Sequence, residues 1–137
     1  MRNVSFLKDW FFCKESDAQC QQVTVPHDWA ISGPFDRNND LQITHIVQNG
    51  EAIDHEQSGR TGGLPHVGKA KYHCTVAGPS APGKRVIFLF DGVMSHAQVY
   101  INGELAGSCN YGYTTFPVDA TDFLKDGENL LEVTVEN

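Results

Sequence analysis

A tight hairpin in the second half of the chain constrains the fold more than any other feature. Residues 96–101 place apolar side chains at every second position, as in a strand that buries one face. Asn102 and Gly103 follow directly, and this dipeptide favours the two-residue turn whose central residues both need a positive φ. Residues 104–109 are then the return strand. The segment predicts an antiparallel β-hairpin with one buried face.

Several other segments carry a β signal. Residues 85–92 form a nearly continuous apolar run closed by Asp-Gly, which predicts a strand buried on both faces. Residues 131–136 alternate instead, with Leu131, Val133 and Val135 predicted to face the core. Shorter strands are predicted at 21–25 and 71–76.

Helix signals are almost absent. Residues 119–124 are the only helix-like piece, a single turn capped by Asp119 or Thr121. Strands at regular spacing with turn signals between them favour an all-β fold, a jelly-roll β-sandwich. No repeat or linker divides the sequence, so we expect a single domain over residues 1–137.

Composition excludes some classes of partner. The net charge of −7 disfavours the phosphate backbone, so no nucleic acid is expected as a partner. No apolar run approaches the roughly 18 residues of a membrane helix, so no membrane is expected either. The first ten residues lack the apolar stretch of a signal peptide.

The cysteines allow two interpretations. Two disulfides are possible, and free thiols, which we favour, are possible too. Cys74 alternates in phase with Tyr72 and Val76, which predicts a core position. No C-x-x-C pair is present, so a zinc ribbon is not expected, and no metal-ligating residues are predicted. The four cysteines are Cys13, Cys20, Cys74 and Cys109.

The segment 32–69 is rich in Gly, Asn, Asp and Gln and carries only one predicted strand, at 41–47. Asp36, Asn38 and Asp40 match the first ligand positions of an EF-hand calcium loop. The glycine and glutamate that the motif requires further on are absent, so an ordinary solvated loop is expected, with a calcium or sodium site of another kind as the alternative.

No catalytic constellation is recognisable. A glycosidase needs two carboxylates facing one bond, and 17 acidic residues make chance pairs unavoidable. The chain is well short of the ~250 residues of a (β/α)₈ barrel. The six histidines make no zinc motif, and His73 is expected to be a surface or half-buried structural residue opposite Cys74. Neither catalytic residues nor a cofactor are expected.

Pro26-His27-Asp28-Trp29 is the most unusual polar cluster. It suits a turn after a strand, with Trp29 as a buried anchor. It also suits a carbohydrate site, because carboxylates accept hydrogen bonds from sugar hydroxyls and aromatic faces stack on sugars. The residues alone leave both interpretations open.

Five segments, taken in order along the chain, resemble those of family-2 glycoside hydrolases. They are 25–36 (VPHDWAISGPFD), 59–63 (GRTGG), 90–93 (FDGV), 97–104 (AQVYINGE) and several positions between 111 and 130. The GRTGG segment resembles the β-galactosidase-like branch in particular. Each match is weak alone, but their common order across nearly the whole chain is specific.

The resemblance implies a galactose-binding-like jelly roll, the amino-terminal sugar-binding-type domain of a larger hydrolase. Its partners would be the remaining domains and a galactoside-type carbohydrate, with catalysis in a separate barrel. It further implies that Asp28 touches the sugar in the intact enzyme, that Trp29 forms a wall or anchor, and that Arg60 lies on an approaching loop. An independent carbohydrate-binding module or a domain-interaction module are the alternatives.

The sequence departs from the family in three places. Many relatives have a Trp at roughly the position of Cys20. The family's Trp-Tyr-Arg is replaced by residues 71–73 (KYH), and the family's next strand would follow Asn137. We therefore interpret the sequence as a cut-out or truncated domain whose unpaired sheet edge could support a homo-oligomer. A periplasmic or extracellular location is favoured for the parent protein.

Overall fold

The computed structural model describes residues 2–39, 41–58, 66–79 and 83–137. Its strands pair in antiparallel ladders throughout, so the all-β prediction is confirmed. The chain forms two compact units, Met1–His27 with Gly68–Asn137, and Asp28–Val67. Among the described residues, no helix has the length and apolar character needed to cross a bilayer.

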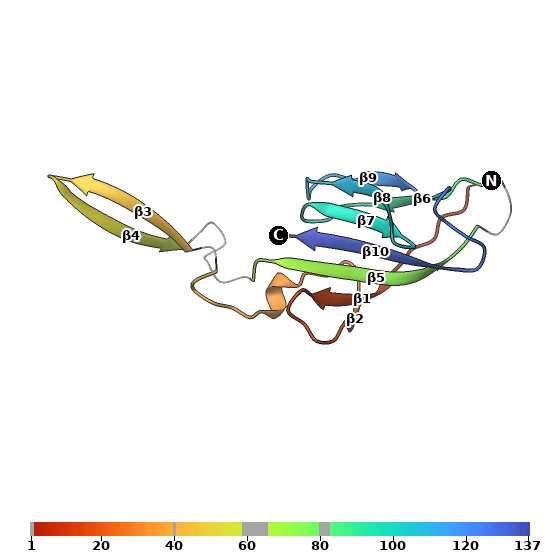
Figure 1. Ribbon diagram of the computed structural model, residues 1–137, viewed down its shortest axis with the longest axis horizontal. Helices are drawn as coiled ribbons and strands as arrows, with labels where there is room; N and C mark the ends of the chain where they lie inside the picture. Colours follow the sequence, from red (N-terminus) through yellow and green to blue (C-terminus); the bar gives the residue numbers. More distant parts are fainter. Residues whose placement is uncertain (1, 40, 59–65, 80–82) are drawn as a thin grey trace. The chain divides into compact units, whose positions relative to one another are not determined.

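The first unit is built on a six-stranded sheet in the order β2-β1-β5-β10-β7-β8 (Figure 1). The long strands β5 and β10 lie at its centre and pair along their whole length. The strands of this sheet are β1 (Asp9–Lys14), β2 (Gln21–Thr24), β5 (Lys69–Ala77), β7 (Ala97–Ile101), β8 (Glu104–Cys109) and β10 (Glu128–Glu136).

A second, smaller ladder pairs β6 (Ile87–Phe90) with β9 (Phe116–Asp119), where the Phe90 and Phe116 rings stack 5.0 Å apart. The prediction that residues 85–92 are buried on both faces is wrong, since Leu89 is 59% exposed. Strand β6 alternates because its ladder has one inner face and one face directed to solvent.

The core of the first unit comes from alternate residues of the sheet and of β9. Ala97, Val99 and Ile101 have no exposed surface, and Leu131, Val133 and Val135 are also buried, which confirms both predictions. The predicted core position of Cys74 is confirmed too. Phe12 and Trp10 add the core side chains of β1, a strand that the sequence patterns did not reveal.

The predicted turns form. Asn102 and Gly103 have φ values of 52° and 86°, as the two-residue hairpin requires. The helix-like piece is one hydrogen-bonded turn, with Leu124 N donating to Ala120 O over 3.1 Å. Asp119 Oδ1 accepts from Thr121 N over 3.1 Å, so Asp119 is the cap.

The second unit contains a short 3₁₀ turn, η1 (Ala30–Ser32), and a hairpin of β3 (Leu41–Gln48) and β4 (Glu51–Ser58). The expectation of a single strand here is wrong, because β4 pairs with all of β3. Asn49 and Gly50 have φ values of 57° and 84° and form the turn. The same dipeptide rule that identified the first hairpin therefore applies here, although β4 itself has a polar, weakly β-forming sequence.

Candidate functional site

Asp28 opens the second unit at an exposed position. Its Oδ1 atom accepts a hydrogen bond from Ala30 N over 3.0 Å, a turn in which the carboxylate binds its own backbone two residues on. Ser32 closes the same turn, because both its N and its Oγ donate to Trp29 O, over 3.3 and 2.9 Å. The carboxylate is therefore fixed in orientation while remaining open to solvent.

Trp29 is buried, with 5% of its surface exposed. Its ring contacts that of His66 edge-on, with the centroids 5.6 Å apart. This burial suits the anchor of the turn, one of the two roles considered for Trp29 from the sequence. Arg60, the third candidate residue, lies outside the described residues.

An aromatic cluster in the first unit, which the sequence patterns did not reveal, holds the residue before Asp28. His27 Nδ1 and Tyr72 Oη lie 2.9 Å apart in a hydrogen bond. The Phe12 ring centroid is 4.9 Å from both rings. Tyr72 belongs to β5, so its hydrogen bond holds His27 against that strand. His27 is the last residue of the first unit's amino-terminal segment.

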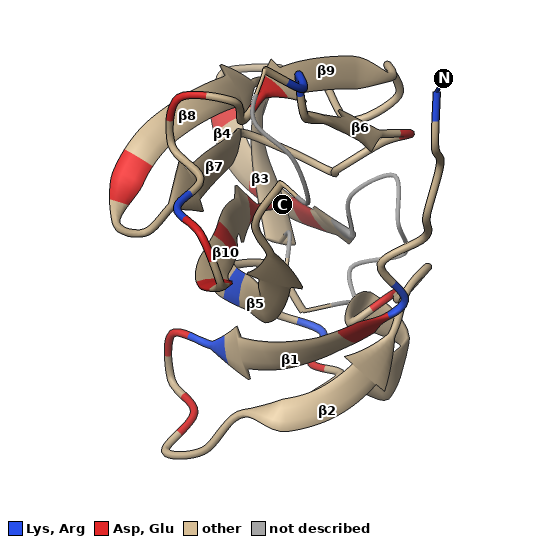
Figure 2. Cartoon of the chain, turned by 90° about the vertical axis from the view of Figure 1, so that its right-hand side faces the viewer, with Lys and Arg blue, Asp and Glu red and all other residues tan. Residues whose placement is uncertain are grey.

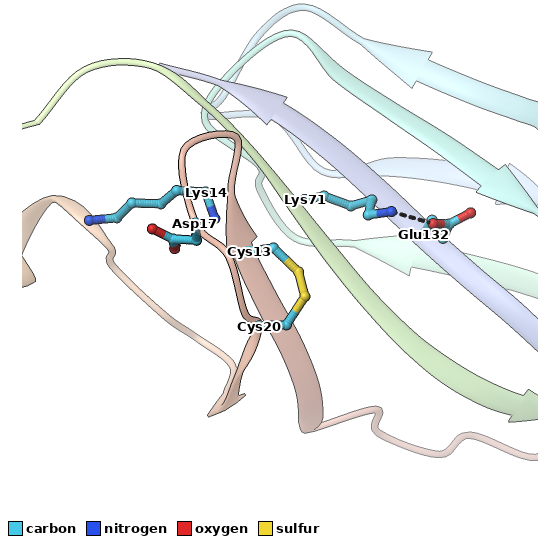
Figure 3. The surroundings of a disulfide bond; sticks show 6 residues. All are labelled: Cys13, Lys14, Asp17, Cys20, Lys71 and Glu132. Carbon is cyan, nitrogen blue, oxygen red and sulfur yellow. Dashed lines mark hydrogen bonds and ion pairs between the residues drawn. A yellow bond between two sulfur atoms is a disulfide. The ribbon is translucent and has the colours of Figure 1, made fainter.

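Cys13 and Cys20 form a disulfide bond, so the preference for free thiols is wrong for these two residues (Figure 3). The physical reason is the register of the β1–β2 hairpin, in which Phe11 faces Gln22. Two residues further on, Cys13 and Cys20 face each other with their Cα atoms 4.5 Å apart, within the range that a disulfide spans.

The other two cysteines are free thiols, as preferred. Cys74 is buried in the core, and desolvation raises its pKa to about 11. Cys109 is half-buried, and its Sγ donates to Tyr111 O over 3.4 Å. Cys74 therefore stays protonated and unreactive at neutral pH.

The outer face of the six-stranded sheet holds a shallow groove of about 600 Å³. Paired charges lie in and next to the groove, with Lys71 Nζ 2.9 Å from Glu132 Oε1 and Lys69 Nζ 3.7 Å from Glu136 Oε2. Figure 2 shows basic positions in blue and acidic positions in red on the ribbon around the labels of β5 and β10. Lysine–carboxylate pairs of this kind leave the two glutamates engaged rather than facing a common substrate bond.

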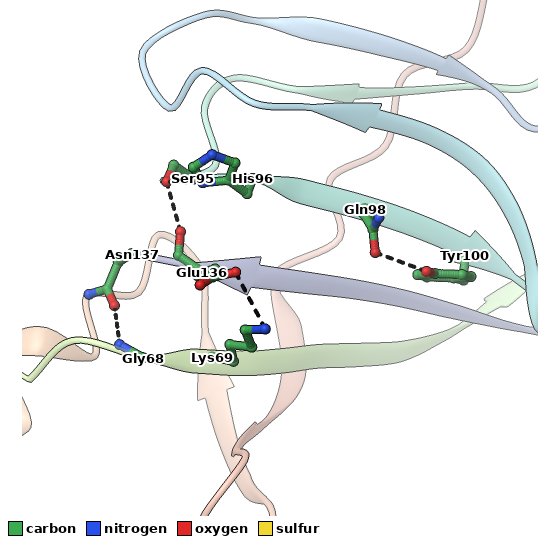
Figure 4. A network of polar contacts seen from close by, with 8 residues as sticks. All are labelled: Gly68, Lys69, Ser95, His96, Gln98, Tyr100, Glu136 and Asn137. Atoms are coloured by element: carbon green, nitrogen blue, oxygen red, sulfur yellow. Dashed lines mark hydrogen bonds and ion pairs between the residues drawn. The ribbon is translucent and has the colours of Figure 1, made fainter.

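Uncharged hydrogen-bonding groups lie in the groove and next to it. Gln98 Oε1 accepts from Tyr100 Oη over 2.9 Å, and Ser95 Oγ donates to Glu136 O over 2.7 Å (Figure 4). Ser108 and Thr134 add hydroxyl groups to the lining. The groove therefore presents polar groups to solvent, and it offers no recognisable acid–base pair among the described residues.

The comparisons with known proteins define the class of this fold. Residues 64–137 match the family described as glycosyl hydrolase 2 galactose-binding domain-like. The solved structure of a glycosyl hydrolase family 2 member from Bacteroides cellulosilyticus is 29% identical with a TM-score of 0.73, covering 100% of this chain and 18% of that one. The chain belongs to the galactose-binding-domain-like family of glycosyl hydrolase 2.

Curated relatives carry two different activities in their names. The chain is 33% identical over 124 residues to "Beta-galactosidase BoGH2A" of Bacteroides ovatus, covering 89% of this chain and 13% of that protein. It is 32% identical over 132 residues to a β-glucuronidase of Bacteroides fragilis, covering 90% of this chain and 18% of that protein. The family and the galactose-binding-like fold expected from the sequence are confirmed, and the relatives include both enzymes.

Proposed function

We propose that this chain is the amino-terminal, non-catalytic domain of a larger family-2 glycoside hydrolase and that it helps to shape the substrate pocket. The proposal is supported by the coverage of the relatives, since the chain spans only 13% and 18% of the two curated hydrolases described above. On this proposal residues 1–137 are one domain, and its partners are the remaining domains of the parent protein.

The exposed, oriented carboxylate of Asp28 is the observation that carries the pocket role. One oxygen accepts from Ala30 N, which leaves the other available to accept hydrogen bonds from sugar hydroxyls. A carboxylate at this position would repel the carboxylate of a glucuronide and would tolerate a neutral galactoside. We therefore assign the parent enzyme a galactoside-type substrate.

The test uses the intact parent enzyme with Asp28→Asn, which retains the oxygen that caps the turn and removes the charge. Loss of a charged hydrogen bond to substrate predicts a fall in kcat/KM of about 10- to 100-fold. Asp36→Asn is the matched control, because Asp36 Oδ1 makes the same kind of turn with Asn38 N over 2.8 Å. Equal kcat/KM values for the two variants would refute the role of Asp28.

The absence of catalysis by this chain is tested separately. The pure 137-residue chain should not turn over a chromogenic galactoside above the rate of buffer. Turnover that a single carboxylate substitution in this chain abolishes would contradict the non-catalytic assignment.

A second function, an independent carbohydrate-binding module, is favoured by the polar groove on the outer face of the sheet. It predicts heat of binding when the isolated chain is titrated with galactose or β-galactosides. Gln98→Ala should weaken that binding, because Gln98 lines the groove and can hydrogen-bond to a sugar hydroxyl. A flat calorimetric trace at millimolar sugar would exclude this function.

A further inference from the structure

Three side chains that can each offer a sulfur or nitrogen atom to a metal ion lie close together on the outer face of the six-stranded sheet. The Sγ atoms of Cys13 and Cys20 and a ring nitrogen of His73 all lie within 4.8 Å of one another. They come from three places in the chain: the end of β1, the residue before β2 and the middle of β5. We refer to these three residues as the Cys-Cys-His cluster.

The strand register brings this cluster together. Phe11 pairs with His73 across the β1–β5 ladder, and Cys13 lies two residues along β1 from Phe11. Side chains two residues apart on a strand, and those directly opposite on the next strand, point to the same face. Cys13 and His73 therefore lie on the outer face of the sheet. Cys20 lies on the same face because it is opposite Cys13 in the β1–β2 hairpin and is bonded to it.

The ring of His73 has an unsatisfied polar atom. Its Nδ1 is buried and has no hydrogen-bond partner among the described residues. A buried polar atom without a hydrogen-bond partner lowers the stability of the folded state, and such atoms are rare in native proteins. Phe11 stacks on the ring at a centroid distance of 5.3 Å and an interplanar angle of 16°, which fixes the plane of the imidazole. The ring is thus held in place beside two sulfur atoms.

We propose that reduction of the Cys13–Cys20 disulfide converts the Cys-Cys-His cluster into a binding site for a zinc ion. Two thiolates and one neutral imidazole would be the protein ligands, with water in the fourth position of a tetrahedron. This cluster lies apart from Asp28 in the sequence and does not depend on the proposed role of that residue.

The chemistry balances with a dithiol as the reductant. The dithiol gives two electrons and two protons to the Cys13–Cys20 bond and becomes a disulfide itself, leaving two protein thiols. Zinc then displaces the two thiol protons, which pass to solvent. Cys20 is exposed, so a reductant can reach its sulfur.

The present spacing is close to what the ion needs. Zinc–sulfur and zinc–nitrogen bonds of about 2.3 and 2.0 Å place tetrahedral ligand atoms about 3.5 to 4 Å apart. Since the ligand atoms lie within 4.8 Å of one another, the ring nitrogen has to move inward by at most about 1 Å, while the two sulfurs separate once their bond is broken. The nearby Lys71–Glu132 pair contributes no net charge, so the two thiolates remain free to offset the charge of the ion.

The experiment titrates the 137-residue chain with Co²⁺ as a spectroscopic probe and with Zn²⁺ in competition, in the oxidised and the reduced state. We expect one ion per reduced chain, a thiolate-to-cobalt charge-transfer band and tetrahedral ligand-field bands, and none of these with the oxidised chain. Far-ultraviolet circular dichroism of the reduced chain should show the same strand content as that of the oxidised chain.

Three variants locate the site. Cys20→Ser and His73→Gln should each weaken zinc binding at least about tenfold, since each removes one ligand. Cys109→Ser is the matched control, because it removes a thiol outside the cluster and should leave the affinity unchanged. Equal affinity of His73→Gln and the parent chain, or a reduced chain that unfolds or binds no ion, overturns the proposal.

Discussion

Asn102 Nδ2 donates a hydrogen bond to Asn129 Oδ1 over 2.8 Å, which joins the β7–β8 turn to the start of β10. Asn129 is 2% exposed and uses both ends of its amide. Its oxygen also accepts from Lys125 N over 2.8 Å, and its Nδ2 donates to Lys125 O and Gly127 O. One buried amide thus supplies hydrogen bonds to the backbone groups of the loop that leads into β10, a central strand of the sheet.

Replacing that amide with a carboxylate of the same shape should be costly. In Asn129→Asp the carbonyl oxygens of Lys125 and Gly127 lose their donor and face a buried negative charge. We expect the free energy of unfolding to fall by about 2 to 4 kcal/mol, measured by urea denaturation. Asn110→Asp adds the same charge at an exposed position and should change it by less than about 0.5 kcal/mol.

The two Asn-Gly turns allow a matched comparison. Asn102→Gly keeps the positive φ but loses the hydrogen bonds of Asn102 Nδ2 to Phe123 O and Asn129 Oδ1. The free energy of unfolding should therefore fall by about 1 to 3 kcal/mol. In Asn49→Gly no side-chain hydrogen bond among the described residues is lost, and the change should stay within about 0.5 kcal/mol. Equal effects in thermal denaturation would show that the Asn102 side chain contributes nothing beyond its backbone conformation.

Gly107 marks a close approach between β8 and β9. A Cβ atom there would lie 2.8 Å from Val118 Cγ2, and Val118 is buried. Gly107→Ala should therefore destabilise the fold by about 1 to 3 kcal/mol in chemical denaturation, while the exposed neighbour Ser108→Ala should be nearly neutral. The penalty should shrink by more than half in a Val118→Ala background, and an undiminished penalty there would exclude this contact as its cause.

Asp119 gives the first unit a defined acid dependence. Hydrogen bonds from Thr121 and Arg85 lower the pKa of its carboxyl from 3.8 to about 2. Because the folded-state pKa lies below the unfolded one, the contribution to stability is present above about pH 4 and is lost as the pH falls through 2. Asp119→Asn should have a lower Tm than the parent chain at pH 7, and the two values should converge towards pH 2.

The control for this pH series is Asp122→Asn, whose carboxylate makes no hydrogen bond or ion pair among the described residues. Its Tm difference from the parent chain should stay constant across the same pH range. A Tm difference for Asp119→Asn that does not change between pH 7 and pH 2 would contradict the role assigned to the Arg85 and Thr121 contacts.

Patterns within a short segment were enough to predict part of the fold. The buried positions 97, 99 and 101 were correct because alternation decides which face of a strand is apolar. The run at 85–92 was placed on a strand, but its burial was wrong because burial depends on how many layers cover the strand. Strand β4 was missed because its sequence is polar and has a weak preference for the β conformation. It is a strand because it pairs with β3 along its whole length.

The candidate site divides in the same way. The sequence drew attention to Asp28 and Trp29, and the structure describes an oriented carboxylate and a buried indole at these positions. The disulfide could not be chosen from the sequence, because four cysteines allow several pairings and free thiols as well. The pairing of Cys13 with Cys20 required the register of the β1–β2 hairpin.

By itself the sequence determined the hairpin at Asn102-Gly103, the apolar faces of its strands and the family to which the chain belongs. These features depend on the backbone preference of single residues and on alternation within one strand. Only the tertiary structure decided the partners of His27, His73 and Asn129 and the pairing of the cysteines. Those contacts join segments distant in sequence or depend on strand register, which is set by the packing of the whole sheet.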